Sequence, residues 1–196
     1  MCPPEPPPED RGPVLLRLAR AAVAEALGLP TAPAPPDPLW LSAPGATFVT
    51  LRSAGRLRGC VGSVRARRTL GDDVRANARA AAFHDPRFPP LAAAEWDGLA
   101  FEVSLLSSPE PLAAASEEAV LAALRPFEDG VILEEGMARA TFLPQVWESL
   151  ATPPEFLTEL KRKAGLPAGH WSAEVRVWRY AVEKWEEGDR AGADRG

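Results

Sequence analysis

Cysteine and histidine are scarce in this chain of 196 residues, which contains only two of each. Cys2, Cys60, His84 and His170 lie far apart in the sequence, so they lack the short ligand spacing of a structural zinc site. The sequence therefore predicts no metal site, and nothing in it indicates a cofactor. Cys2 belongs to a tail rich in proline and acidic residues, and we expect no disulfide between Cys2 and Cys60. A reducing cytoplasm is the location that this cysteine usage favours.

Long apolar runs are also absent. No run approaches the roughly 18 apolar residues that a membrane-spanning helix needs, so we expect no membrane segment. The first residues are Met and Cys followed by prolines and acids, without the basic and apolar parts of a signal peptide. The net charge of −5 argues against a dedicated nucleic-acid-binding protein, because such proteins present a basic surface. The hydrophobic fraction of 46% is sufficient for a sizeable core.

The first half of the chain contains patterns of both helix and strand. Apolar residues recur at three- and four-residue spacing over Val14–Leu27, which predicts an amphipathic helix. Six prolines make residues 30–44 an extended connector, which Trp40 and Leu41 would anchor to the core. The remaining elements predicted in this half are a hairpin over Thr47–Ser63, a helix from near Thr69 to Phe83, a fixed loop over His84–Pro90 and a strand over Leu99–Leu106.

The second half repeats this order. Its predicted elements are a helix over Ser116–Arg125, a hairpin with strands Val131–Leu133 and Ala138–Leu143, helices near Pro144–Leu150 and Pro154–Ala164, and a long strand from Glu174 to about Trp185. Arg58 follows Gly55 by three residues, as Arg139 follows Gly136. Duplicated β-β-α-β units with largely antiparallel sheet would make a two-lobed α+β domain. The lobes would span about 11–110 and 111–187, and we expect disorder in residues 1–10 and 188–196.

The register of the first hairpin decides which side chains share a face. Ser53-Ala54-Gly55 predicts a three-residue loop, with the glycine in the left-handed conformation. The resulting pairs are Leu51 with Leu57, Thr50 with Arg58, and Phe48 with Cys60. Because strand side chains alternate, Arg58 and Cys60 would then share one face, and Val49, Leu51 and Leu57 the other.

The stretch Leu57-Arg58-Gly59-Cys60-Val61-Gly62 is the best candidate for chemistry. A thiol beside arginine can become a thiolate, because a nearby guanidinium lowers the pKa of a cysteine. Cys60 would then be a nucleophile or a redox-active group. The alternative is a small buried hydrophobic residue, which is a common role of free cysteine. Gly59 and Gly62 would let a substrate come close, but they equally suit a bulge or a neighbouring side chain packed on the strand.

Two arginines are candidate anion ligands. The guanidinium of Arg58 suits a carboxylate or phosphate, and Arg87 in the proline-rich loop has the same chemistry. Either residue could instead form an internal ion pair. For Arg58 the acidic partner would be a residue such as Asp85 or Glu102.

His84 and Asp85 form a histidine–acid pair next to each other in this loop. A Cys–His–Asp arrangement activates a nucleophile, because the histidine accepts the thiol proton and the acid orients the histidine. His84 is therefore a candidate base for Cys60, and its alternative role is that of an exposed loop residue.

Four segments of the chain resemble the AMMECR domain family, whose bacterial and archaeal members are also called AmmeMemoRadiSam system protein A. The first is the hairpin just described, where the family usually has isoleucine in place of Val61. The other three segments are Asp85–Leu91, Ala140–Trp147 and Lys163–Pro167. The resemblance runs from the first helix to Trp185. It implies a compact two-lobed α+β domain with the cysteine motif near a cleft, and it does not imply a defined activity.

Three functions are compatible with these patterns. The first is an enzyme, or a subunit of an enzyme system, with Cys60 and His84 as catalytic residues. Its substrate would contact Arg58, Gly59, Gly62, Asp85 and Arg87. The second is a binding or scaffold domain without chemistry, and the third is a nucleic-acid-associated protein. The family name reflects co-occurrence with a Memo-like protein and a radical SAM protein, which the resemblance therefore implies as partners in a modification pathway.

Overall fold

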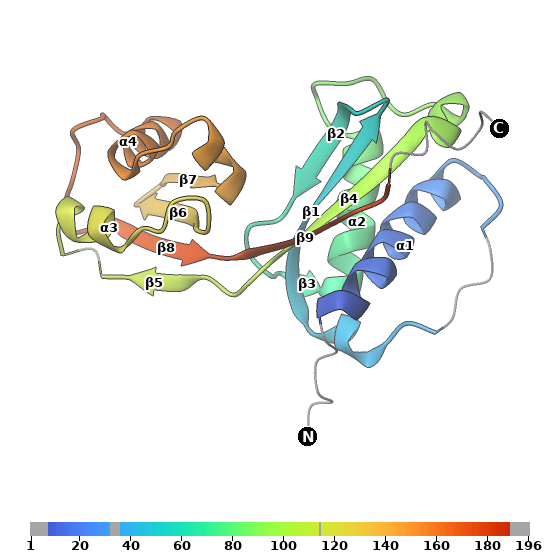
Figure 1. The fold of residues 1–196 in the computed structure, drawn as a ribbon, viewed down its shortest axis with the longest axis horizontal. Coiled ribbons are helices and arrows are strands. Elements are labelled where there is room, and N and C mark those ends of the chain that lie inside the picture. The colour runs from blue at the N-terminus through green and yellow to red at the C-terminus, as the bar shows by residue number, and fades with distance from the viewer. Residues whose placement is uncertain (1–7, 32–35, 114, 189–196) are drawn as a thin grey trace. The chain divides into compact units, whose positions relative to one another are not determined.

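The structure is a computed structural model and describes residues 8–31, 36–113 and 115–188 (Figure 1). It contains helices and two largely antiparallel sheets, which confirms the α+β class. The chain divides into two compact units. Unit 1 comprises Met1–Leu105 and Glu183–Gly196, and unit 2 comprises Leu106–Val182. Residues 183–187 thus belong with the first part of the chain, whereas the sequence-based division had put them in the second lobe.

Unit 1 is built on a sheet with the strand order β2-β1-β4-β9, with the short strand β3 also paired to β1. Its elements are α1 (Pro8–Ala26), the 3-10 helix η1 (Leu39–Ser42), β1 (Pro44–Ser53), β2 (Arg56–Gly62), β3 (Arg68–Thr69), α2 (Leu70–Phe83), the 3-10 helix η2 (Ala93–Gly98), β4 (Leu99–Leu106) and β9 (Val182–Glu186). Alternate strand residues such as Val49, Leu51 and Phe101 are buried in one core with residues of α1 and α2. The predicted periodicities therefore locate the core of this unit correctly.

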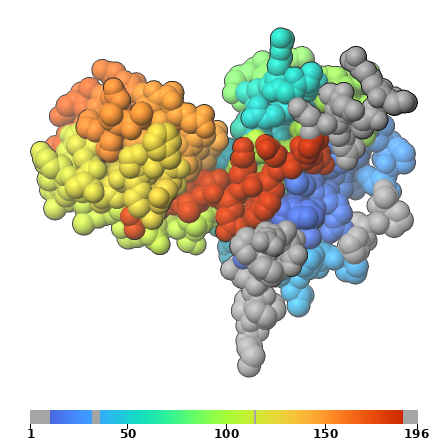
Figure 2. Space-filling view, in the orientation of Figure 1, coloured from blue at the N-terminus to red at the C-terminus, as the bar shows by residue number. Residues whose placement is uncertain are grey.

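Strand β9, close to the end of the described chain, packs against the first helix, α1. Trp185 of β9 packs into the same core and lies against Gly12, where a Cβ atom would come within 2.4 Å of the indole ring. Arg20 donates two hydrogen bonds to the carboxylate of Glu187, at 2.8 and 2.5 Å. Figure 2 shows the atoms of β9, in red, beside those of α1, in blue. The first helix and the last strand therefore stabilise each other.

Unit 2 has the strand order β5-β8-β6-β7. Its elements are β5 (Glu110–Leu112), α3 (Glu117–Ala123), β6 (Gly130–Glu135), β7 (Ala138–Phe142), the 3-10 helix η3 (Pro144–Glu148), α4 (Pro153–Lys163) and β8 (Arg176–Tyr180). Val131, Leu133 and Val177 are buried in its core. The rings of Trp147 and Phe156 stack there with their centroids 3.8 Å apart.

The two units contain the repeat that the sequence predicts. In both, a helix precedes a hairpin, a second helix follows, and the next strand pairs with the first strand of the hairpin. The orders β2-β1-β4-β9 and β7-β6-β8-β5 correspond strand by strand. The predicted correspondence between Arg58 and Arg139, each three residues after a turn glycine, is wrong. In the strand pairing, Arg139 occupies the position that Leu57 has in the first hairpin.

The predicted long strand over Glu174–Trp185 is wrong. It is two strands, β8 and β9, which flank Ala181 and belong to different sheets. Strands β4 and β5 are divided between the two sheets in the same way. A hydrophobic pattern reports which residues are buried and does not report where a chain passes from one sheet to the next.

The N-terminal helix is longer than its apolar pattern predicts. It begins at Pro8, includes Pro13, and so takes in part of the expected tail. Leu41 is buried as expected of the connector. Residues 1–7, with Cys2, and residues 32–35 and 189–196 lie outside the described residues.

Candidate functional site

The hairpin that carries Cys60 differs in register from the prediction. Its turn has two residues, because Ser53 pairs with Arg56, and Ala54 and Gly55 both have positive φ angles of 48° and 75°. This is the conformation of a type I′ turn. The pairing then shifts between Leu51 and Arg52, which leaves Arg58 as an extra residue in β2.

The bulge changes the partner of every residue after it. Leu51 pairs with Gly59, Thr50 with Cys60, and Phe48 with Gly62. Leu57 pairs with Arg52 and is 39% exposed, so it does not join Leu51 in the core. The predicted register is therefore wrong by two residues over the motif, because one added residue combined with a shorter loop is invisible to the apolar pattern.

The two glycines of the motif are sites of close approach within the protein. A Cβ atom on Gly59 would lie 2.1 Å from the carbonyl oxygen of Ala81 in α2. A Cβ atom on Gly62 would lie 2.2 Å from the ring of Phe48. Packing within the protein therefore requires glycine at both positions. The close approach of a substrate is not needed to explain either glycine.

Cys60 lies beside Thr50, on the face of the sheet opposite to Gly59. Its thiol is free, and the residue is half-buried. The hydroxyl of Thr50 donates a hydrogen bond to its Sγ at 3.3 Å. The sulfur is thus in contact with a polar donor, whereas a cysteine that serves only as core filling is surrounded by apolar groups.

The loop after α2 binds the backbone of Cys60. Because β2 is an edge strand, one side of its backbone has no neighbouring strand. There the N–H of Cys60 donates to Oδ2 of Asp85 at 2.9 Å, and its carbonyl oxygen accepts from Nη2 of Arg87 at 3.3 Å. Asp85 and Arg87 together, called here the Asp85–Arg87 pair, take the place of a neighbouring strand at this one residue.

The Asp85–Arg87 pair is strongly polarised. Asp85 is buried, and the Arg87 guanidinium holds the pKa of this carboxyl well below its ordinary value, with help from the N–H groups of Cys60 and Arg87. The same carboxylate raises the pKa of Arg87. The side chain of Arg87 is 54% exposed. A fixed positive charge that solvent can reach is therefore bonded to the backbone of Cys60.

Arg58 forms an ion pair, but with neither of the acids considered from sequence. Its Nε and Nη2 donate to the carboxylate of Glu95 at 2.7 and 3.0 Å, and Nη2 also donates to the carbonyl oxygen of Pro89. This pairing raises the pKa of Arg58 and, together with the N–H of Ala92, lowers that of Glu95. The side chain is only 11% exposed, and its contacts are with the loop rather than with Cys60. The guanidinium that contacts Cys60 is that of Arg87, through the backbone carbonyl oxygen.

His84 is exposed and lies at the C-terminal end of α2, where its backbone N–H donates to Ala80. Among the described residues, no hydrogen bond joins its ring to Cys60. Asp85 binds Arg87 and the backbone of Cys60, and does not orient His84. The Cys–His–Asp arrangement considered from sequence is therefore not formed in this structure.

Sequence reasoning missed a buried polar cluster around Asp73. One carboxylate oxygen accepts from the backbone N–H and the hydroxyl of Thr47 and from the amide of Asn77. The other oxygen accepts from Ser63 and Arg68. The sequence does contain a sign of this cluster, because Asp73 and Asn77 are four residues apart and therefore lie on the same face of α2. Acids are common in the first turn of a helix, where they interact favourably with its dipole, so Asp73 did not stand out as a buried hydrogen-bond acceptor. The cluster joins α2 to β1 and to Ser63, the residue that follows β2.

The described part of the chain contains no group of three or more His, Cys, Asp or Glu side chains suited to a metal ion. None of its helices is both long and apolar enough to cross a bilayer.

Fold and site together define a class: an α+β protein of two similar hairpin-containing units, with a cysteine on an edge strand bound by an Asp–Arg loop. Residues 16–185 match the AMMECR1 family, and the chain belongs to that family.

Relatives of known sequence and structure agree with this assignment. A protein of Methanothermobacter thermautotrophicus is 38% identical over 186 residues, which cover 91% of this chain and 95% of that protein. A protein of Thermotoga maritima is 39% identical over 153 residues, which cover 77% and 82%. The crystal structure of the uncharacterized protein PH0010 from Pyrococcus horikoshii has 34% identity and a TM-score of 0.81, and it covers 93% of this chain and 94% of its own.

Proposed function

We propose that this protein is an enzyme, or the substrate-contacting subunit of an enzyme system, whose functional group is the thiol of Cys60. The observation that carries the proposal is the surroundings of the sulfur. It accepts a hydrogen bond from Thr50, and the half-exposed guanidinium of Arg87 donates to the backbone carbonyl oxygen of the same residue. In general, hydrogen-bond donors and cations favour a thiolate over a thiol.

The other residues of the motif divide into two roles in this proposal. Arg87 is exposed enough to contact a carboxylate or phosphate of a substrate while it keeps its bonds to Asp85. Asp85 and Arg58 position the loop, because each is largely buried and bonded within the protein. Gly59 and Gly62 set the packing of the hairpin. His84 has no part in the arrangement as it stands.

Alkylation by iodoacetamide, followed by mass spectrometry, tests the proposal. The Cys2→Ser variant leaves Cys60 as the single thiol, so the measured rate belongs to one group. We expect Cys60 to be alkylated in the folded protein, and the added Arg87→Gln change to slow alkylation severalfold. Arg56→Gln is the matched control, because Arg56 is an exposed arginine of the same strand. Alkylation that occurs only after unfolding, or equal effects of the two arginine changes, would refute the proposal.

A non-catalytic binding domain is the second candidate, and one observation favours it. Arg58, Asp85 and Arg87 all make bonds within the protein, so the site has fewer uncommitted charges than the sequence suggested. Cys60→Ser separates the two candidates once a substrate or partner is known. Binding that survives the substitution together with full pathway activity would favour the scaffold.

The partners that we propose, from the family resemblance, are Memo-like and radical SAM proteins. Co-expression with an affinity tag on this chain tests the association, with Arg87→Gln and Arg56→Gln as the compared variants. We expect no contribution from nucleic acid, because the net charge is −5. Retention on a polyanion that falls steeply with added salt would overturn that expectation.

A further inference from the structure

Phe88 is a half-buried aromatic residue that does not pack into the hydrophobic core of unit 1. It lies in the loop after α2, and its N–H donates to the carbonyl oxygen of Asp85 at 3.1 Å, which closes a turn that contains Arg87. Leu91 already anchors this loop to the core, in which it is only 4% exposed. The contacts of the Phe88 ring therefore have to be sought outside the core.

Two guanidinium groups lie over the ring of Phe88. The Cζ atom of Arg58 is 5.8 Å from the ring centroid, and the Cζ atom of Arg87 is 5.6 Å from it. A cation within about 6 Å of the centroid is attracted to the face of an aromatic ring. The ring of Phe88 thus connects the ion pair of Arg58 and Glu95 to the Asp85–Arg87 pair.

Arg58 is the fixed member of this arrangement. Its Nε and Nη2 atoms donate to Glu95, and its side chain is only 11% exposed. Its Nη1 atom is buried and has no hydrogen-bond partner within the described part of the chain. An aromatic face is a weak acceptor for N–H groups, so Phe88 gives this guanidinium a favourable neighbour. The ring is therefore held in place by a residue that is itself bound on one side to the loop.

Arg87 is the member that solvent reaches. Its side chain is 54% exposed, whereas that of Asp85 is only 3% exposed, so a solute meets the positive member of the pair first. Its Nε and Nη2 atoms bind Asp85, and none of the described residues accepts a hydrogen bond from Nη1. Nη2 also donates to the carbonyl oxygen of Cys60 at 3.3 Å. The sulfur of the same residue therefore lies within the Debye length of about 10 Å that applies at 0.1 M salt.

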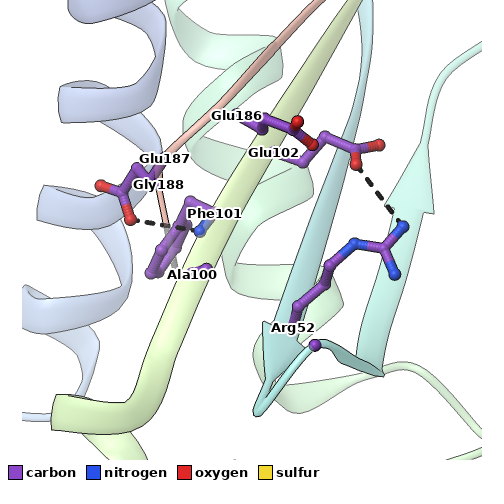
Figure 3. A pocket seen from close by; sticks show the side chains of 8 residues that line it. Arg52, Ala100, Phe101, Glu102, Glu186, Glu187 and Gly188 are labelled. Atoms are coloured by element: carbon purple, nitrogen blue, oxygen red, sulfur yellow. Dashed lines mark hydrogen bonds and ion pairs between the residues drawn. The ribbon is translucent and has the colours of Figure 1, made fainter. Parts of the chain in front are cut away.

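A polar hollow elsewhere in unit 1 has the opposite charge balance (Figure 3). Its volume is about 520 Å³, and the charged residues that line it are Arg52, Glu102, Glu186 and Glu187. Glu102 forms an ion pair with Arg52, at which Figure 3 shows it directed, and accepts a hydrogen bond from Lys184. Because carboxylates outnumber the one guanidinium that lines the hollow, an anion would be repelled there. The exposed guanidinium of Arg87 is a more favourable place for an anion.

We propose that Phe88 is a positioning residue whose ring holds the guanidinium of Arg87 at the backbone of Cys60, and that this guanidinium selects substrates with an anionic group. The inference rests on the proposed function, because it needs a thiol that a substrate can reach. The substrate class is a molecule with a carboxylate or phosphate close to the position that meets the thiol. Arg87 binds that group through Nη1 while Nε and Nη2 keep their bonds to Asp85.

The ratio of the alkylation rates with iodoacetate and with iodoacetamide tests the proposal. Both reagents react with the thiolate of Cys60 and release iodide, so the ratio does not depend on the pKa of the thiol and reports how strongly the site attracts a negative charge. In the Cys2→Ser protein, we expect Phe88→Leu to lower the ratio by about twofold, since Coulomb attraction across about 8 Å of water has roughly that effect on a rate. Phe88→Tyr should keep the wild-type ratio, because it keeps the ring.

The Arg87→Gln background separates positioning from packing. There, Phe88→Leu should leave the ratio unchanged, because the group that the ring holds is absent. Phe127→Leu is the matched control, because it removes a ring that is 61% exposed in unit 2, and it should not change the ratio. Phe88→Met takes the place of Phe88→Leu if that variant does not fold.

Three results would each overturn the inference. They are an unchanged ratio in Phe88→Leu, a loss in Phe88→Tyr as large as that in Phe88→Leu, and an equal effect of Phe88→Leu with and without Arg87. Failure of both reagents to alkylate the folded protein is a different result, which would refute the proposed function and the inference with it.

Discussion

Asp85 offers the sharpest test of how the loop binds the edge strand. Its carboxylate accepts a bond from the N–H of Cys60 at 2.9 Å, and removal of the side chain leaves that half-buried donor without its partner. A hydrogen bond to a charged group contributes about 1.5–3 kcal/mol. The bonds to Arg87 add less, because Arg87 is half-exposed and such pairs contribute about 0–1 kcal/mol. We therefore expect Asp85→Ala to lower the free energy of unfolding by about 2–3 kcal/mol at pH 7.

Arg87→Ala is the decisive comparison. It removes the exposed partner and leaves the bond from Cys60 to Asp85 in place, so we expect a loss of about 1 kcal/mol or less. Asp97→Ala, at an exposed acid of the neighbouring 3-10 helix, should change stability by less than about 0.5 kcal/mol. Urea unfolding followed by tryptophan fluorescence measures all three variants. A loss in Arg87→Ala as large as that in Asp85→Ala would refute the reasoning.

The pH dependence gives an independent check. The pKa of Asp85 is lower in the folded protein than the value of about 3.9 expected after unfolding. A lowered folded pKa contributes stability above the unfolded value, and this contribution is lost as the pH falls below it. The wild-type protein and Asp85→Ala should therefore differ most at neutral pH and converge below about pH 4. A difference that stays constant between pH 7 and pH 2 would contradict an ionised Asp85.

Three further predictions follow from packing and burial. Gly59→Ala should destabilise the protein by about 3 kcal/mol or more in urea unfolding, because the new methyl group meets the Ala81 backbone, whereas Gly62→Ala meets only a side chain and should cost less. Asp73→Ala should lower stability by about 3–5 kcal/mol in the same assay, because it leaves several buried donors unpaired, and a loss under 1 kcal/mol would contradict the bonding described. Tyr180 is the single tyrosine, and burial raises its pKa to about 12. Tyrosinate absorbance should therefore stay low up to pH 11 while the protein is folded, and stability should fall as the pH rises from about 10 towards 12, so a folded-state transition near pH 10 would be inconsistent with this burial.

The sequence was sufficient for most elements of the fold. The helix at Leu70–Phe83 is preceded by Thr69 as its N-cap, and the side chain of Thr69 accepts a hydrogen bond from the N–H of Asp72, close to the predicted helix start. Strand β4 and both hairpins lie close to their predicted positions. These elements follow from local patterns of hydrophobic residues with a period of two or 3.6 residues, and such patterns can be recognised in a single sequence.

The details of the site could not be predicted from the sequence in the same way. A bulge at Arg58 changes the register by adding one residue that no periodicity marks. The partner of Arg58 is Glu95, which lies 37 positions along the chain, and ion-pair partners at that distance depend on the path of a loop. The sequence identified Cys60, Asp85 and Arg87 as candidate site residues, and the structure places them together through backbone bonds that side-chain chemistry alone did not suggest.

The division of strands between the two sheets has a consequence for the assembly of the chain. Each half of the repeat ends with a strand that completes the other half's sheet, since β5 pairs with β8 and β9 is hydrogen-bonded to β4. A polypeptide cut between β5 and α3 would yield two fragments, each missing an outer strand that its companion carries. Reciprocal exchange of this kind is the arrangement of a domain-swapped dimer, here covalently fused into one molecule. Each sheet of the present chain is therefore completed by a strand from the other half of the repeat.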